Sequence, residues 1–344
     1  MSQTLGICLG FLNIAAKPEI LSPNSKKLIT ILIKATIITL AFIFIYWKLT
    51  NNENLSNFQT LIKDLPAIQI YFTFGFILIL MFVNWTIEAI KWRYLLKPIE
   101  KITIWKSIES VFCGLTWAIF TPNRIGEYGG RVFFLSPRKR ILGAISMLIG
   151  SLSQLMIINV AGSLALIWFI GRFIPLNFWL HYAIAVLVMA FCLFFLLFYF
   201  NIRWLNNLLL SFDFFKRFRQ LLGILTRYRG EALFKVSMLS LLRFCISTSQ
   251  YCLAINLLLP AIDISDACMM VFILFFVYSV VPSVDLLDIG VRSLTATYFF
   301  SYITHQEVAV IAATACIWFT NLVLPAIIGS VFVLKLNFFG PTRN

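Results

Sequence analysis

Two polar segments interrupt long apolar stretches of this sequence, and they decide how the chain folds. Residues 121–131 read TPNRIGEYGGR, and residues 282–292 read PSVDLLDIGVR. The first lies inside an apolar stretch at about 105–135, and the second inside one at about 267–303. Each apolar half is only about 14–18 residues long, whereas a membrane-spanning helix needs roughly 20. We therefore expect neither stretch to cross a membrane as one straight helix.

The composition of the chain places it in a membrane. Of the 344 residues, 60% are hydrophobic and only 12% are charged. Soluble domains carry roughly 25% charged residues, and a soluble fold of this length could not bury so much apolar surface. We therefore expect an integral membrane protein without a soluble domain of useful size.

Uninterrupted apolar runs predict six membrane-spanning helices, at 28–47, 68–96, 142–170, 178–200, 233–259 and 308–334. Together with the two broken stretches they predict an all-α, polytopic fold. The expected organisation is a cytoplasmic N-terminal stub at 1–27, a transmembrane domain at 28–336 and a cytoplasmic tail at 337–344.

The basic residues predict the orientation of the spans. The net charge is +14, and Lys and Arg gather in short cytoplasmic loops of membrane proteins. The basic segments at 91–106, 138–140 and 203–235 are therefore expected inside, and both termini with them. This placement requires each broken stretch to leave on the side it entered, the first from the cytoplasm and the second from outside. The same charge pattern argues against nucleic-acid binding.

The two polar segments resemble each other. Each has a proline followed by acid-x-Gly-x-Arg, namely Pro122, Glu127, Gly129 and Arg131 in the first and Pro282, Asp288, Gly290 and Arg292 in the second. The surrounding sequence predicts a repeat at about 68–170 and another at about 233–334. Repeats that enter from opposite faces are typical of inverted-topology transporters, whose broken helices meet near the membrane midplane.

The first polar segment has residues suited to a turn inside the membrane. Thr121 is expected to cap the second half-helix, with Pro122 at its first position. Glycines at Gly126, Gly129 and Gly130 are expected to allow close backbone approach. The N-terminus of such a half-helix favours an anion.

Charged side chains at this depth need partners, because an Arg at the bilayer centre costs about 2.5–3.5 kcal/mol on insertion scales. The candidate binding residues are Glu127, Arg131, Asp285, Asp288, Arg292 and Arg243. One interpretation is internal ion pairing, since Glu127 and Arg131 stand four residues apart, as do Asp288 and Arg292. The other is a cavity in which two guanidinium groups grip a phosphate headgroup. Arg243 either faces this cavity or snorkels to the surface. Glu88 and Lys91 are expected to form a local pair near an interface.

At these residues the chain resembles the lysylphosphatidylglycerol synthase transmembrane-region family, also called flippase-like domain proteins. The first motif resembles Pro-x-x-x-Gly-Glu followed by Arg, here Pro122, Gly126, Glu127 and Arg131. The second resembles Pro-Ser/Thr followed by Gly-Val-Arg, here Pro282, Ser283, Gly290, Val291 and Arg292. Many relatives carry Glu where this chain has Ser293, and Asp285 or Asp288 would then substitute. The resemblance covers roughly 26–336 and implies handling of lipids or lipid-linked headgroups, alone or beside a synthase or glycosyltransferase.

The leading functional hypothesis is therefore a translocase for a phosphate-bearing lipid in a bacterial inner membrane. The alternatives are a membrane-embedded transferase that acts on a lipid-linked donor, and a non-catalytic partner of a separate synthase. No catalytic residue, metal site or cofactor is predicted, and the sequence lacks a Gly-x4-Gly-Lys-Ser/Thr phosphate loop. The seven cysteines show no spacing of a disulfide framework or zinc site.

Overall fold

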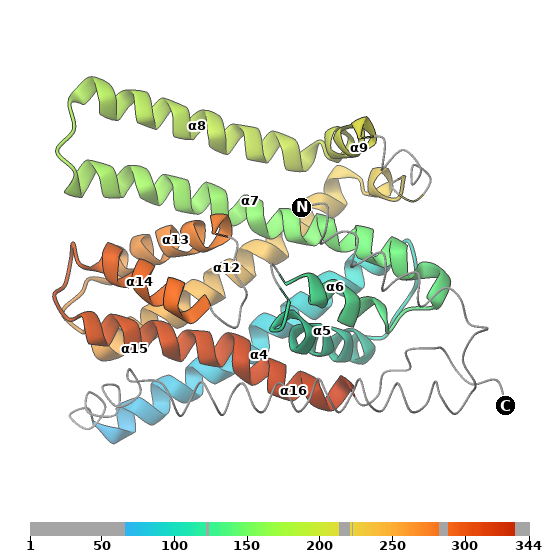
Figure 1. Ribbon diagram of the computed structural model, residues 1–344, viewed down its shortest axis with the longest axis horizontal. Helices are drawn as coiled ribbons and strands as arrows, with labels where there is room; N and C mark the ends of the chain where they lie inside the picture. The colour runs from blue at the N-terminus through green and yellow to red at the C-terminus, as the bar shows by residue number, and fades with distance from the viewer. Residues whose placement is uncertain (1–65, 122–123, 213–220, 222, 282–287, 334–344) are drawn as a thin grey trace.

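Every element in the described part of the chain is a helix. The computed structural model describes residues 66–121, 124–212, 221, 223–281 and 288–333 (Figure 1). The long helices are α4 (Ala67–Leu96), α7 (Arg140–Phe173), α8 (Phe178–Phe200) and α12 (Gly230–Leu258). The shorter ones are α5 (Ile104–Ala118), α6 (Ile125–Val132), α9 (Ile202–Ser211), α13 (Ile264–Val280), α14 (Asp288–Phe300), α15 (Glu307–Trp318) and α16 (Leu324–Val333). Short turns form η1 (Pro137–Lys139) and η2 (Leu225–Arg227), and the π-helical turn η3 (Phe319–Val323) joins α15 to α16. The predicted all-α class is confirmed.

Five helical segments of the described residues are long and apolar enough to cross a membrane. They are Ala67–Leu96, Pro137–Phe173, Phe178–Phe200, Gly230–Leu258 and Glu307–Val333. Each coincides within a few residues with one of the predicted spans, because a long apolar run in lipid satisfies its backbone groups as a helix. The predicted span at 28–47 lies outside the described residues. The chain is therefore a multi-pass membrane protein.

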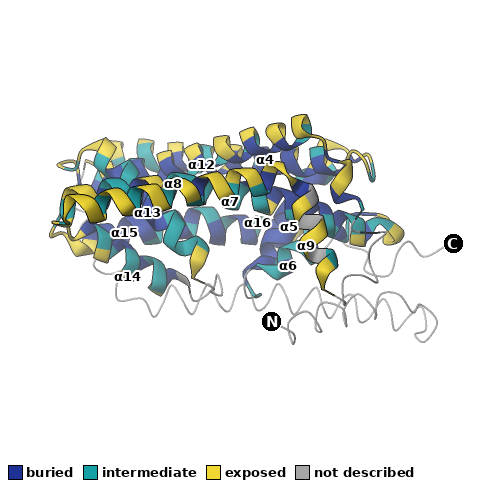
Figure 2. Cartoon of the chain, turned by 90° about the horizontal axis from the view of Figure 1, so that it is seen from above, coloured by how far each residue is buried: buried dark blue, intermediate teal, exposed yellow. Residues whose placement is uncertain are grey.

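α7 and α8 lie side by side, and α4 and α12 run diagonally to them, with α12 packed against both α4 and α7 (Figure 1). α8 runs beside α7 at one side of the bundle, and only Cys192 and Tyr199 of its residues are buried. Exposed residues accordingly follow α8 along its length (Figure 2). Such an apolar and exposed helix is suited to face lipid, whereas α12 is suited to the interior of the bundle.

The first broken stretch folds as two packed helices, α5 and α6. The expected cap at Thr121 with Pro122 at the first helical position is wrong. α6 begins only at Ile125, after Arg124 in the left-handed conformation with φ of 57°. The Thr121 hydroxyl instead accepts a hydrogen bond from the Gly126 amide at 2.7 Å, and Pro122 lies outside the described residues. Thr121 thus still satisfies an amide at the start of α6, from farther upstream than predicted.

The second broken stretch forms α13 and α14, of 17 and 13 residues. Their connection at 282–287, with Pro282 and Asp285, lies outside the described residues. α6 has only 8 residues, fewer than expected, and a turn at 133–135 connects it to η1. The pair α5–α6 lies toward the end of the bundle where α4 ends, and α13–α14 toward the opposite end (Figure 1). Re-entry of both pairs into the membrane stays a prediction.

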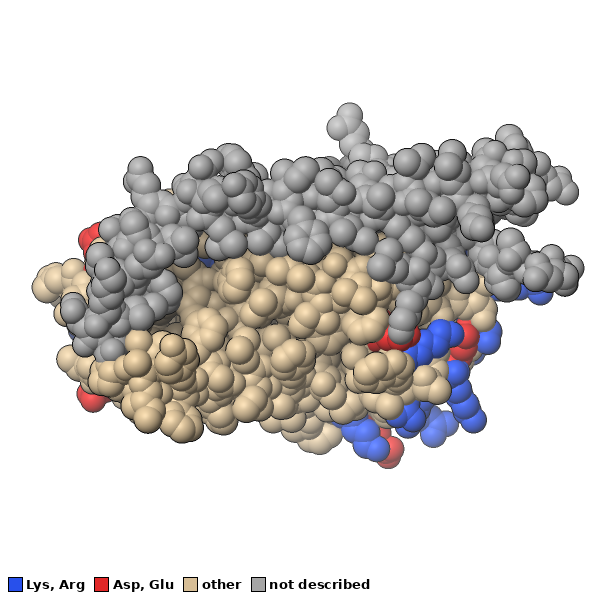
Figure 3. All heavy atoms as spheres, turned by 90° about the horizontal axis from the view of Figure 1, so that it is seen from below, with Lys and Arg blue, Asp and Glu red and all other residues tan. Residues whose placement is uncertain are grey.

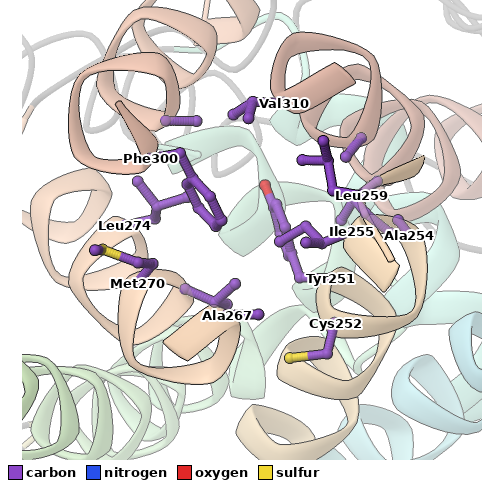
Figure 4. Close-up of a cluster of buried hydrophobic side chains, with 14 of the residues drawn as sticks. Tyr251, Cys252, Ala254, Ile255, Leu259, Ala267, Met270, Leu274, Phe300 and Val310 are labelled. Atoms are coloured by element: carbon purple, nitrogen blue, oxygen red, sulfur yellow. The ribbon is translucent and has the colours of Figure 1, made fainter. Parts of the chain in front are cut away.

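The largest buried apolar cluster holds α13 and α14 against α12 and α15. Tyr251 of α12, Leu274 of α13 and Phe300 of α14 point into it (Figure 4). All three side chains are at most 2% exposed. This core occupies the half of the bundle that contains the second broken stretch, and the buried charges described below occupy the other half.

Candidate functional site

A polar stripe on one face of α4 forms the base of the candidate site. Asn84, Glu88 and Lys91 are spaced i, i+4 and i+7, which places them on one side of a helix. All three are buried, although the rest of α4 is almost entirely apolar. Because these side chains are buried, their polar atoms need partners within the protein.

Glu88 joins three cationic side chains. Its Oε1 accepts a hydrogen bond from Arg131 Nη1 of α6 at 2.7 Å, and its Oε2 lies 2.7 Å from Lys91 Nζ. Oε2 also accepts from Arg243 Nη1 of α12. The Glu88 side chain is only 9% exposed, so these charge-assisted bonds replace its hydration. One carboxylate therefore links α4, α6 and α12.

A second carboxylate lies on α6 beside the first. Arg131 Nη2 donates to Glu127 Oε1, and Arg124 Nε lies 3.2 Å from Glu127 Oε2. Glu127 and Arg131 are four residues apart on the same helix, which is the predicted pairing distance. Arg131 thus lies between two carboxylates, Glu88 and Glu127, one on each terminal nitrogen.

Arg243 reaches the same cluster from α12. Its Nε donates to Asn84 Oδ1 at 2.9 Å, and Asn84 Nδ2 donates to Ser247 Oγ at 3.2 Å. Its guanidinium also lies over the Trp85 ring, 4.9 Å from the centroid, an arrangement that favours a cation. Arg243 therefore faces the interior of the bundle. Of the two predicted alternatives, the cavity and the surface, the first is the one present.

These side chains border a cavity of about 300 Å³ between α4, α6, α7 and α12. α7 contributes Met147, Ser151 and Gln154 to its wall, and Tyr128 of α6 bonds Ser151 at 3.0 Å between the two hydroxyl oxygens. The charged residues that line it are Lys91, Arg124, Arg131, Arg243, Glu88 and Glu127. Basic side chains outnumber acidic ones among these described residues, so the cavity is suited to an anion.

Small residues bring α5 and α6 together beneath the charges. A Cβ at Gly130 would lie 2.6 Å from the Cα of Gly114 on α5, and a Cβ at Gly126 would lie 2.3 Å from the Trp117 carbonyl oxygen. The close approach expected at Gly129 is wrong, because a Cβ there would meet nothing within 4 Å. A Cβ at Gly290, which was expected only to belong to a turn, would also meet nothing within 4 Å. These two glycines point away from their neighbours, whereas Gly126 and Gly130 face α5.

The structure brings three of the six candidate binding residues together at the cavity. Glu127, Arg131 and Arg243 line the cavity. Arg292 does not line it, and its guanidinium lies 4.8 Å from the ring centroid of Tyr278 on α13. Asp285 lies outside the described residues, and Asp288 begins α14 with a side chain that is not described. The guanidinium that meets Arg131 across Glu88 is therefore that of Arg243.

Sequence reasoning missed the central role of Glu88. The predicted Glu88–Lys91 pair is present, but it lies inside the protein with Arg131 and Arg243 rather than as a local pair near an interface. The available signal was the i, i+4, i+7 spacing of Asn84, Glu88 and Lys91 in an otherwise apolar helix. Ionisable residues inside membrane segments are rare and usually face the bundle interior.

Comparison with known proteins gives one match. The family model described as lysylphosphatidylglycerol synthase TM region matches residues 31–329. No curated protein and no solved structure matches significantly. The matched range includes every described residue that lines the cavity.

Proposed function

Because the chain belongs to the lysylphosphatidylglycerol synthase transmembrane-region family, we propose that it translocates a phosphate-bearing lipid and binds the headgroup in the α4–α6–α7–α12 cavity. The family supports a function on membrane lipids. The observation that carries the finer proposal is the cluster of Lys91, Arg131 and Arg243 around a 300 Å³ cavity in a multi-pass membrane protein.

Arginine suits such a site because its planar fork matches phosphate oxygens bidentately. Two guanidinium groups, from α6 and α12, approach the same carboxylate. A headgroup in the cavity that contacts both guanidinium groups would bridge two helices that belong to different parts of the chain. Relative movement of α6 and α12 would then change the affinity for the headgroup, which a translocation cycle requires.

The charge distribution supports an inner-membrane placement with both termini in the cytoplasm. Basic side chains gather at one end of the described bundle (Figure 3), the end at which α4 finishes and α7 begins. Short loops that are rich in Lys and Arg mark the cytoplasmic side of the membrane. The headgroup cavity lies toward this end, so the proposed lipid enters from the cytoplasmic leaflet. A separate synthase or glycosyltransferase is the proposed source of that lipid.

The translocation proposal is tested by a lipid-flipping assay in proteoliposomes that contain fluorescent phosphatidylglycerol. The informative variants are Arg131→Lys and Arg243→Lys, which keep the positive charge but remove the fork. Loss of one charge-assisted bond of roughly 1.5–3 kcal/mol corresponds to about a 10- to 100-fold weaker interaction. We expect a loss of flipping of about that size.

Arg138→Lys is the matched control, because Arg138 is exposed and does not line the cavity. It should flip lipid at the wild-type rate. Wild-type rates in all three variants would refute the assignment of the headgroup site. Absence of flipping by the wild type, with anionic and zwitterionic lipids both supplied, would refute the translocase function.

A further inference from the structure

The basic side chains of the cavity are already paired with acidic side chains of the protein. Arg131 Nη1 donates to Glu88 at 2.7 Å and Nη2 donates to Glu127. These two nitrogens form one fork of the guanidinium, and that fork is a surface with which arginine binds phosphate bidentately. A phosphate that binds along the N–H bonds now directed at Glu88 and Glu127 must therefore displace at least one carboxylate.

The two carboxylates differ in how firmly they are held. Glu88 is bound by Lys91, Arg131 and Arg243, from three segments of the bundle, and its side chain is 9% exposed. Glu127 is bound by Arg131 and Arg124, both on or next to the short helix α6. Its side chain is more exposed than that of Glu88, and Arg124 is the most exposed of the four cations.

Glu127 also keeps a partner when it leaves Arg131. Its second oxygen, Oε2, already lies 3.2 Å from Arg124 Nε. A rotation of the Glu127 side chain toward Arg124 would free Arg131 Nη2 without leaving a charge unpaired inside the protein. Departure of Glu88 would instead leave Lys91 and Arg243 without their shared counter-ion.

We propose that Glu127 is a displaceable counter-ion, which occupies on Arg131 the position that an anionic headgroup takes and moves toward Arg124 when the headgroup binds. Glu88 stays in place and orients Arg131 and Arg243. This inference rests on the proposed headgroup site. Its consequence is that Glu127 competes with the lipid, which weakens binding and speeds release.

Glu127→Gln tests the competition, because glutamine has the same shape but no charge. Purified protein in neutral detergent is titrated with dihexanoyl phosphatidylglycerol and, separately, with inorganic phosphate. We expect E127Q to bind the lipid about tenfold more tightly than the wild type, and to flip long-chain lipid more slowly because release is slower. Glu127→Asp, which keeps the charge but shortens its reach toward Arg131, should lie between the two.

Glu100→Gln is the matched control. Glu100 does not line the cavity and binds the Ser136 amide at 3.3 Å, so its removal makes the same change in net charge elsewhere. Equal tightening by E100Q and E127Q, or no tightening by E127Q while the wild type binds, would overturn the counter-ion role and leave the headgroup site standing. Absence of binding of both probes to the wild type would refute the headgroup site itself. Binding of phosphatidylglycerol without inorganic phosphate would assign the ligand as a lipid.

An independent observation concerns two cysteines at the opposite end of the bundle. Cys252 Sγ of α12 lies 3.0 Å from Cys268 Sγ of α13, and both are free thiols in the structure. Cys252 lies at the edge of the cluster in Figure 4. Residues 259–268 contain two aspartates and no Lys or Arg, and the proposed orientation puts this end on the side away from the cytoplasm. Disulfides persist on that side of a bacterial inner membrane.

We infer that Cys252 and Cys268 form a disulfide that ties α13 to α12, although the cysteine spacing gave no such signal. The bond forms by exchange with an oxidised dithiol protein: the two thiols of this chain lose two electrons and two protons, and the acceptor disulfide becomes two thiols. No other reactant is needed.

Thiol counting tests this disulfide. Protein from cells is denatured and treated with a maleimide polymer before and after reduction, and the gel shifts are compared. We expect two additional reactive thiols after reduction in the wild type and in the Cys245→Ser control, and none in Cys252→Ser. Full reactivity of the wild type without reduction, even after exposure of the folded protein to diamide, would overturn the inference.

Discussion

Glu88 illustrates what a single residue contributes to this molecule. Its carboxylate faces Lys91, Arg131 and Arg243, so Glu88→Gln leaves three cations close together in a poorly hydrated site. Breaking a buried ion pair costs roughly 3–5 kcal/mol. We expect E88Q to lower the thermal unfolding midpoint in detergent by several degrees, whereas E100Q should lie close to the wild type. A wild-type midpoint for E88Q would show that Glu88 does not stabilise the bundle.

The sequence predicted individual residues of this site better than it predicted the contacts between residues of different helices. The spacing of Glu127 and Arg131 predicted a pair that the structure contains. The sequence left Arg243 with two alternatives, and it could not indicate that Glu88 joins Arg131 to Arg243. That convergence depends on which faces of α4, α6 and α12 meet, and packing between helices determines those faces.

At the scale of elements, two glycines on α6 provide a matched pair of tests for the α5–α6 contact. A Cβ at Gly130 would lie 2.6 Å from Gly114 Cα, which is backbone and cannot rotate away, whereas a Cβ at Gly129 meets nothing within 4 Å. We expect Gly130→Ala to force α6 from α5 and to lower the unfolding midpoint and lipid binding together. Gly129→Ala should be neutral or stabilising by up to about 1 kcal/mol, because Ala favours helix over Gly. Equal midpoints for the two variants would contradict this packing.

Tyr228 anchors the segment before α12 to two other helices. Its hydroxyl donates to the Leu95 carbonyl of α4 and lies 3.0 Å from Ser146 Oγ of α7. Burial raises the pKa of Tyr228 to about 12, above the value near 10 of an unfolded chain. The stabilisation from neutral Tyr228 is therefore fully present below about pH 10 and is lost as the pH rises toward 12.

Tyr228→Phe should remove this contribution, at a cost of about 1 kcal/mol for the lost hydrogen bonding. Thermal unfolding midpoints measured from pH 8 to pH 11.5 test it, since other groups titrate equally in both proteins. We expect the difference between the wild type and Y228F to shrink above about pH 10. A constant difference across this range would argue against ionisation of Tyr228 as the cause.

The elements themselves followed closely from the sequence where apolar runs were unbroken. α8 has the predicted bounds, Phe178–Phe200, because lipid leaves a long apolar segment no alternative to a helix. The turn between α5 and α6 was not predictable in the same way. There Arg124 adopts a left-handed conformation, and the Thr121 hydroxyl accepts a bond from an amide five residues ahead. An N-cap side chain normally bonds an amide two or three residues ahead, so the standard capping pattern did not predict this turn.

At the scale of the whole molecule, the two broken stretches occupy opposite ends of one bundle. α5–α6 places Arg131 in the cavity, and α13–α14 packs into the apolar core with α12 and α15. The repeats predicted from similar motifs thus have different environments: Arg131 faces two carboxylates at the cavity, whereas Arg292 does not line the cavity and lies near Tyr278. The motif similarity indicated related elements, but burial and charge distinguish the half that is suited to bind an anion.

Opposed re-entry of the two stretches makes a definite prediction about sidedness. If α5–α6 leaves the membrane where it entered, Lys101 and Arg138 lie on the same side, and if α13–α14 does so, Asp263 and His305 share the other side. All four residues are exposed, so a cysteine introduced at any of them into a cysteine-free background is open to reagent. An impermeant maleimide added to intact cells should label positions 263 and 305 and leave 101 and 138 unlabelled until the membrane is opened, because basic loops stay inside. Labelling of 101 and 138 from opposite sides would mean that α5 and α6 together cross the membrane, and the cavity would then open toward a different leaflet from the one proposed.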